Sequence, residues 1–389
     1  MIRDILFGKI NCSLKTYYNI MEKPKRLMAL DAFRGLTIAT MITVNTPGSW
    51  SHVYAPLLHS KWHGCTPTDL VFPFFLFAVG VAMFFAFGKF NHQLNAEAGK
   101  KIIKRTLIIF GIGLLLNAFP FYHIKFENLR IMGVLQRIAL AYGIGSFLCL
   151  TLNKTRLLYL SGAILFSYWG LVYFFGGENP YSLEGNPTMA FDTMILGASH
   201  MYKGFGITFD PEGLFSTLPA IVTVILGYLT GALISKSEKK RIVPKLLVFG
   251  AFGVILGLVW SLGFPINKPI WSSSYVIYTA GLAQLLMAVM IYLIDILDYK
   301  KWAHPFLVFG MNPLFIFVLS AVWVKIIVYV VHFADDAGKV MNGYSWLYQN
   351  GFASWAGPLN GSLLFALSHI LVYWLIVLYL YRKRIFIKI

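Results

Sequence analysis

The chain has 389 residues, of which 58% are hydrophobic and 16% aromatic, while only 13% carry a charge. Its mean hydropathy is +0.67, whereas a soluble domain has about 45–50% apolar and about 25% charged residues. Because the apolar residues extend over the whole length, this composition excludes an ordinary soluble protein and predicts an all-α, polytopic membrane protein.

The formal net charge of +17 could indicate binding to nucleic acid or to an anionic surface. A simpler explanation is favoured here, because positive residues collect in the cytoplasmic loops of membrane proteins. We therefore predict the lipid bilayer as a partner, and no nucleic acid.

A helix needs about 20 apolar residues to cross the hydrocarbon core of a bilayer. About ten segments of the chain are suited to this, in one transmembrane domain (residues 27–389) that follows a basic N-terminus (residues 1–26). The predicted spans are 30–49, 69–90, 102–121, 131–152, 156–176, 213–235, 244–264, 273–296, 305–330 and 361–381.

The distribution of lysine and arginine predicts the orientation of these spans. If the N-terminus is cytoplasmic, 24 of these residues fall on the cytoplasmic side and six on the opposite side, and three lie within spans. Such a bias is typical of cytoplasmic loops. We therefore expect both termini to be cytoplasmic and the loops 50–68, 177–212 and 331–360 to be extracytoplasmic.

The first two predicted spans are joined by a polar loop that contains His59, and Asp69 follows at the start of the second span. Histidine can take a proton from an amine or a hydroxyl and can itself be acylated. Thr66 and Thr68 are suited to cap the second helix, whose N-terminus favours the Asp69 carboxylate. We hypothesise a catalytic His59–Asp69 pair; a structural role for a histidine in a loop is the alternative.

Asn45 lies near the outer end of the first predicted span and precedes a Thr-Pro-Gly sequence. A helix end or a turn would explain an asparagine here. Its amide could also hold a carbonyl oxygen or an oxyanion. The residue alone leaves both interpretations open.

Two arginines fall within predicted spans. Arg34 follows Asp31 by three residues, so the two can form an ion pair on one helix face; alternatively, Arg34 could bind the phosphates of a cytoplasmic cofactor.

Arg137 stands beside Gln136, seven residues after Arg130, and needs a charged partner or a polar cavity at this depth. The candidate partners of Arg137 are Glu127, Asp210 and Glu212. A site for an anionic ligand is the other interpretation.

The sequence contains no phosphate-binding loop, no dinucleotide-binding glycine motif and no zinc-binding spacing. Its three cysteines (Cys12, Cys65 and Cys149) are far apart and form no metal-binding pattern. We predict no metal site.

Five motifs, taken in order, resemble a known family. They are LDAFRGLTIATMITVN…HSKWHGCTPTDLVFPFFLFAVG, LRIMGVLQRIALAY, FDPEGLFSTLPAI, NKPIWSSSYV and GMN, between about residues 27 and 380. The resemblance is to the heparan-α-glucosaminide N-acetyltransferase family with its bacterial homologues, and the DAFRG segment is also similar to broader membrane acyltransferases that O-acetylate envelope glycans.

The resemblance implies a transferase that moves acetyl from cytoplasmic acetyl-CoA to an amino sugar across the membrane. It places the catalytic histidine at His59 and the matching asparagine and aspartate at Asn45 and Asp69. We expect the remaining candidates to help bind acetyl-CoA; these are Arg34, Arg130, Gln136 and Arg137. A multi-pass protein of the bacterial inner membrane is expected, and a homodimer is suggested by analogy.

Two alternatives stay open at the level of the sequence. One is O-acetylation of a hydroxyl on an envelope polysaccharide. The other is a transporter for sugars or lipid-linked precursors, which would consume no acyl-CoA. The residues do not choose between an acetyl-histidine intermediate and direct transfer, and they do not identify the acceptor.

Overall fold

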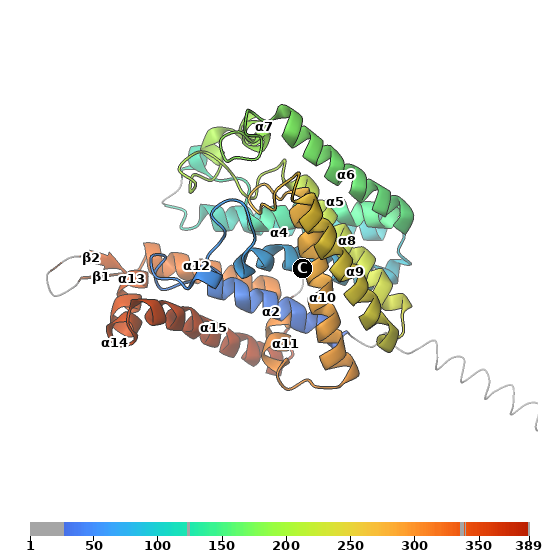
Figure 1. Cartoon of the computed structure of the whole chain (residues 1–389). Helices are drawn as coiled ribbons and strands as arrows, with labels where there is room; N and C mark the ends of the chain where they lie inside the picture. Colours follow the sequence, from blue (N-terminus) through green and yellow to red (C-terminus); the bar gives the residue numbers. More distant parts are fainter. Residues whose placement is uncertain (1–26, 123–124, 335–337, 339, 388–389) are drawn as a thin grey trace, which may run out of the picture.

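The computed structural model describes residues 27–122, 125–334, 338 and 340–387, so the predicted basic N-terminus and Cys12 lie outside the described residues. Helices dominate this part of the chain, and the strands β1 (His332–Ala334) and β2 (Val340–Asn342) form a short antiparallel pair. Figure 1 shows the helices as one bundle. The predicted all-α, polytopic membrane class is confirmed.

The helices follow one another in this order: α2 (Met28–Asn45), α3 (Val71–Phe87), α4 (Ala96–Ala118), α5 (Val134–Thr151), α6 (Lys154–Phe175), α7 (Pro187–Leu196), α8 (Thr217–Lys236), α9 (Lys239–Trp260), α10 (Ser273–Met290), α11 (His304–Met311), α12 (Pro313–Tyr329), α13 (Gly343–Tyr348), α14 (Ser354–Ala356) and α15 (Pro358–Arg382). A 3₁₀ turn, Pro67–Leu70, leads into α3, and a π-helical turn, Ile291–Ile296, continues α10.

All ten predicted spans are helical, with two qualifications. Within the described residues, seven helices are long and apolar enough to cross a membrane, or eight if the bent pair α11–α12 counts as one span. Helices α2 and α4 fall outside this set, because polar residues such as Asp31 and Arg34 lower the hydropathy of α2 and several cations lie in the first half of α4.

The predicted span 305–330 is not one continuous helix. It is divided into α11 and α12, which meet at an angle of 84°. The break falls at Asn312, whose backbone is not helical, and Pro313 begins the second helix. Proline cannot donate the backbone hydrogen bond that a continuous helix would need there.

Glycines allow α3 and α8 to pack with their backbones in contact. A Cβ atom added at Gly80 of α3 would lie 2.0 Å from the carbonyl oxygen of Val224, and one added at Gly227 of α8 would lie 2.1 Å from that of Phe77. Small residues at such crossings are typical of helix pairs in membranes. The contact fixes α3, and with it Asp69, against the centre of the bundle.

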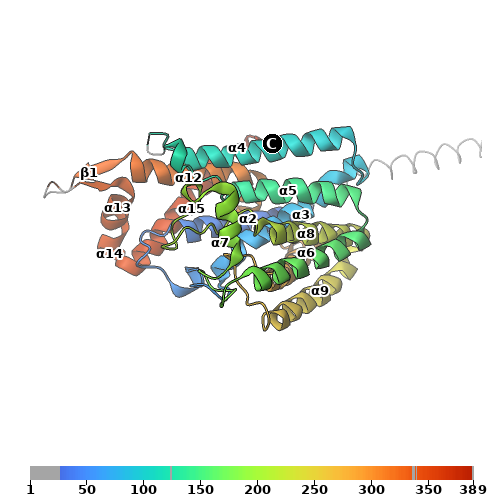
Figure 2. The same cartoon turned by 90° about the horizontal axis from the view of Figure 1, so that it is seen from above.

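The long loops gather at one end of the bundle. In Figure 2 the β1–β2 pair lies at the left, and the loop between α2 and α3 and helix α7 lie nearer the middle, at the left-hand ends of the long helices. The turns that follow α3, α5 and α8 lie toward the right. The three loops predicted to be extracytoplasmic therefore share an end. Their side of the membrane remains a prediction.

Candidate functional site

The carboxylate of Asp69 is buried and held at the entrance to α3. Its Oδ2 atom accepts hydrogen bonds from the backbone amides of Ser60 and Thr66, both at 3.0 Å. The side chain is 1% exposed. Thr66 and Asp69 form a capping box at this helix start, an arrangement that satisfies otherwise unpaired amides. Helix capping thus fixes both the position and the rotamer of the carboxylate.

His59 is oriented by this carboxylate. Its Nδ1 atom lies 2.6 Å from Oδ1 of Asp69, and its side chain is 43% exposed. An ionised carboxylate can only accept hydrogen bonds, so this contact is satisfied when the Nδ1 atom of His59 carries the proton and donates to Oδ1. Nε2 is then the unprotonated nitrogen and can act as a base, as in other histidine–carboxylate pairs.

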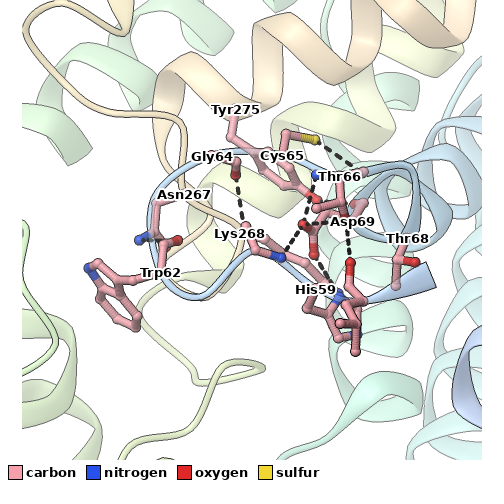
Figure 3. A network of polar contacts seen from close by, with 12 residues as sticks. His59, Trp62, Gly64, Cys65, Thr66, Thr68, Asp69, Asn267, Lys268 and Tyr275 are labelled. Carbon is pink, nitrogen blue, oxygen red and sulfur yellow. Dashed lines mark hydrogen bonds and ion pairs between the residues drawn. The ribbon is translucent and has the colours of Figure 1, made fainter. Parts of the chain in front are cut away.

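A third charged group, Lys268, contacts both members of this pair. It comes from the loop before α10, and its Nζ atom lies 3.5 Å from Oδ1 of Asp69 and 3.1 Å from Nδ1 of His59. Figure 3 shows Lys268 and His59 converging on the same carboxylate. Burial lowers the pKa of Lys268, although Asp69 and Glu212 oppose this effect. The ammonium group offsets the charge of a carboxylate that is withdrawn from water.

The loop that carries His59 is anchored on two other loops. The indole nitrogen of Trp62 donates to the carbonyl oxygen of Tyr181 at 2.7 Å, and the Nδ2 atom of Asn267 donates to the carbonyl oxygen of Trp62 at 3.1 Å. Gly64 has a φ of +109°, which favours glycine, and its amide donates to the carbonyl oxygen of Ile266 at 2.8 Å. His59 is therefore presented by a supported loop.

A cavity of about 180 Å³ opens beside His59. It follows α2 from Asn45 to Thr37, and these two residues are eight positions apart, which corresponds to about 12 Å of helix. The rim near His59 is polar, and the wall formed with α3, α5 and α12 is apolar. The full lining consists of Thr37, Ile38, Met41, Val44, Asn45, His59, Thr68, Val71, Phe72, Phe75, Val134, Ile138, Glu212, Lys268 and Phe317.

Comparison with known proteins now identifies the family. A model of the family described as "Heparan-alpha-glucosaminide N-acetyltransferase, catalytic" matches residues 26–259, more than half of the chain. The chain belongs to this family. The resemblance inferred from the five motifs is confirmed.

Two curated proteins named heparan-alpha-glucosaminide N-acetyltransferase are similar to the chain over most of its length. The protein from Mus musculus is 28% identical, and the match covers 75% of this chain and 53% of the relative. The protein from Homo sapiens is 27% identical, and the match covers 96% of this chain and 61% of the relative. The chain thus spans between half and two thirds of the length of these relatives.

The acetyltransferase family match includes the three candidates for catalysis, and the structure brings them together. His59 and Asp69 are in contact, and Asn45 lines the same cavity as His59. Their catalytic roles remain a proposal, which the arrangement supports.

The predicted cofactor-binding residues form two groups. One lies near the beginning of α2, and the other lies at the end of the bundle that holds His59. Arg34 lies near its beginning, where its guanidinium donates to the carbonyl oxygen of Gly310 and lies 3.8 Å from Asp31. Thr37, the last α2 residue of the cavity, is one turn away and donates to the carbonyl oxygen of Arg34. Arg34 therefore remains a candidate for binding the donor.

Arg130, Gln136 and Arg137 lie instead at the end of the bundle that holds His59. Arg130 makes ion pairs with Asp210 and Glu212 at 2.6 Å. Although burial acts to lower the pKa of Arg130, these two carboxylates raise it above its ordinary value. Arg130 thus helps to build the end of the cavity that holds His59, and a role in binding the donor remains a prediction.

Arg137 is fully buried, and the groups that accept its hydrogen bonds are neutral. It donates to the carbonyl oxygen of Gly213 at 3.1 Å and to the hydroxyl of Ser216, and it lies over the Trp271 ring. Gln136 packs where α5 meets Gly113 of α4. Both side chains are enclosed, so we expect them to support the fold around the site.

Two polar residues of the cavity rim, Lys268 and Glu212, were not among the predicted site residues. They lie 209 and 153 positions after His59. Both occur within motifs that resemble the family, NKPIWSSSYV and FDPEGLFSTLPAI, and this was the signal in the sequence that they belong to the site. Nothing in the local pattern specifies which residues of these motifs reach the cavity.

Proposed function

We propose that the protein is a membrane acetyltransferase that moves acetyl from acetyl-CoA to the amine of an extracytoplasmic amino sugar. One observation carries the proposal: a histidine–aspartate pair stands at the polar rim of a cavity whose apolar part runs along α2. Family membership and the names of the relatives agree with it.

The contacts suggest a role for each residue in the reaction. Nε2 of His59 takes a proton from the acceptor nitrogen as that nitrogen attacks the thioester carbonyl carbon. The carbon–sulfur bond breaks, and the thiolate leaves with a proton returned by His59. Asp69 stabilises the imidazolium that forms in between. Asn45, on the wall of the same cavity, donates to the thioester oxygen.

The donor is proposed to enter from the opposite end of α2. Acetyl-CoA is too highly charged to cross a bilayer, so its nucleotide stays near Arg34 while the acyl arm occupies the apolar part of the cavity. This proposal includes a cytoplasmic donor, an extracytoplasmic acceptor and, by analogy, the bacterial inner membrane and a homodimer.

The first test is transfer of radiolabelled acetyl from acetyl-CoA to glucosamine by the purified protein. His59→Ala should lower the rate by about 10³-fold or more, and Asp69→Asn by about 10²- to 10⁴-fold, because histidine–carboxylate pairs act as a unit. His63→Ala is the matched control, because His63 lies in the same loop but faces Asn267 and does not line the cavity.

Full activity of a folded His59→Ala protein would overturn the assignment. Sugar flux through vesicles without consumption of acetyl-CoA would indicate a transporter. An acetylated product that is cleaved by mild base would indicate an ester, and hence O-acetylation, whereas an amide would resist this treatment.

A further inference from the structure

The rim of the cavity contains a carboxylate that the proposed mechanism does not use. Glu212 lines the cavity together with His59 and Lys268. Its Oε2 atom accepts from Arg130 at 2.6 Å, and its backbone amide donates to Asp210 at 3.0 Å. These contacts hold Glu212 in place, and its side chain is 14% exposed. The Oε1 atom has no hydrogen-bond partner within the parts of the chain that the structure covers.

Arg130 does not need Glu212 for neutralisation. Asp210 receives two hydrogen bonds from Arg130, at 2.9 and 2.6 Å, and is itself fully buried. A bidentate arginine–carboxylate pair is charge-balanced and geometrically complete. Glu212 therefore adds a second negative charge to a cation that is already paired.

A count of the charges around the site also leaves the negative charge of Glu212 without a compensating cation. Three cations (Arg130, Arg137 and Lys268) stand against four carboxylates (Asp69, Asp192, Asp210 and Glu212). Lys268 offsets Asp69. Of the four described carboxylates, Glu212 alone lines the cavity. One negative charge is thus unbalanced, and it faces the space in which a substrate would sit.

A surplus charge beside an apolar cavity is costly unless a ligand of opposite sign compensates it. The amine of an amino sugar is an ammonium group near neutral pH, whereas a sugar hydroxyl is neutral. We infer that Glu212 binds the ammonium group of the acceptor and selects amines over hydroxyls. This inference rests on the proposed function and assigns its acceptor site to Glu212.

In this arrangement the ammonium donates to Oε1 of Glu212. It first loses one proton to solvent. The free amine then attacks the thioester while Nε2 of His59 takes a second proton from the nitrogen and returns it to the departing thiolate, so each transfer releases one proton overall. Glu212 is not consumed or modified.

The inference is tested by steady-state kinetics of Glu212→Gln with glucosamine and acetyl-CoA. The KM for glucosamine should rise by about tenfold or more, because a charge-assisted hydrogen bond is lost. The KM for acetyl-CoA should stay within about twofold of the wild-type value, because the donor enters along α2. Glu212→Asp should restore part of the affinity for glucosamine.

Asp210→Asn is the matched control. It also removes a carboxylate from Arg130, but Asp210 does not line the cavity. It should lower the thermal stability while leaving the KM for glucosamine within about twofold. An equal rise of this KM in both variants would assign the effect to Arg130 and overturn the inference.

A binding measurement keeps the test independent of turnover. In the His59→Ala background, calorimetric titration should detect glucosamine, and adding Glu212→Gln should abolish that binding while any binding of glucose is unchanged. An unchanged affinity for glucosamine would contradict the inference alone. A wild-type protein that transfers acetyl to no acceptor would contradict the proposed function itself.

Discussion

Individual side chains of the site depend on each other through charge. Asp69 is buried, yet it is compensated by two backbone amides and by Lys268, so it stays an acceptor for His59. An isolated carboxylate at this depth would instead be destabilising. The base strength and the orientation of His59 are thus set by groups that need not touch a substrate.

Asp192 provides a prediction at this scale. It is a buried residue of α7 that accepts a hydrogen bond from the amide of Phe215 at 2.9 Å. Burial raises the pKa of Asp192 to about 6, above its ordinary value of about 3.9. A raised carboxyl pKa favours the folded state at low pH, and this contribution is lost as the pH rises through about 4 to about 6.

Asp192→Asn should therefore be more stable than the wild type at pH 7.5, by about 2–3 kcal/mol, and equally stable near pH 4. Thermal unfolding of both proteins in detergent across this pH range checks the difference. A gap that does not change with pH would mean that the pKa of Asp192 is the same in the folded and unfolded states, which would contradict the prediction.

The residues of the site were predictable to different degrees. His59 and Asp69 are ten positions apart, and a helix start between them places both in reach of each other. Lys268 and Glu212 come from distant loops, and their positions depend on how α8 and α10 pack. A single sequence contains the motifs of these residues but not the contacts that bring them to His59.

The helices and strands were also predictable to different degrees. The apolar runs predicted the helices well, because a membrane span has a minimum length and few charges. The 84° break between α11 and α12 was only indicated by its Asn-Pro sequence. Helix α7 and the β1–β2 pair were not predicted, because the long loops that contain them have no sustained apolar periodicity.

The crossing of α3 and α8 gives a prediction for helix pairs. Gly80→Leu should destabilise the protein by at least about 1–3 kcal/mol, because overpacking forces the two backbones apart. Activity should fall as well, since Asp69 lies in the turn that leads directly into α3. Thermal unfolding and the acetyl-transfer assay check both effects.

Gly162→Leu on α6 is the control for this change, because a Cβ atom at Gly162 meets nothing within 4 Å. It should retain normal unfolding. Equal losses in the two variants would show that the cause is leucine in a helix rather than the α3–α8 contact.

The molecule as a whole has two different ends, and the positive residues predicted which one faces the cytoplasm. Lys203 lies in the loop between α7 and α8, and Lys301 lies in the turn before α11; both are exposed. Burial raises the pKa of Cys65 to about 12, which makes this thiol poorly reactive.

In a background without the native cysteines, Lys203→Cys should react with a membrane-impermeant maleimide on intact cells. Lys301→Cys should react only after the cells are permeabilised. Mass-tagging on gels measures both reactions. The reverse pattern would place His59 on the cytoplasmic side and refute the proposed direction of transfer.

The length of the cavity has a consequence for how such a protein would use energy. The space beside His59 already extends along α2 to within one turn of Arg34. Under the proposed function, a thioester arm and a sugar would therefore meet without either being carried from one compartment to the other. Turnover would then draw only on the hydrolysis energy of the thioester. It should proceed in detergent micelles and be indifferent to ionophores that collapse ion gradients.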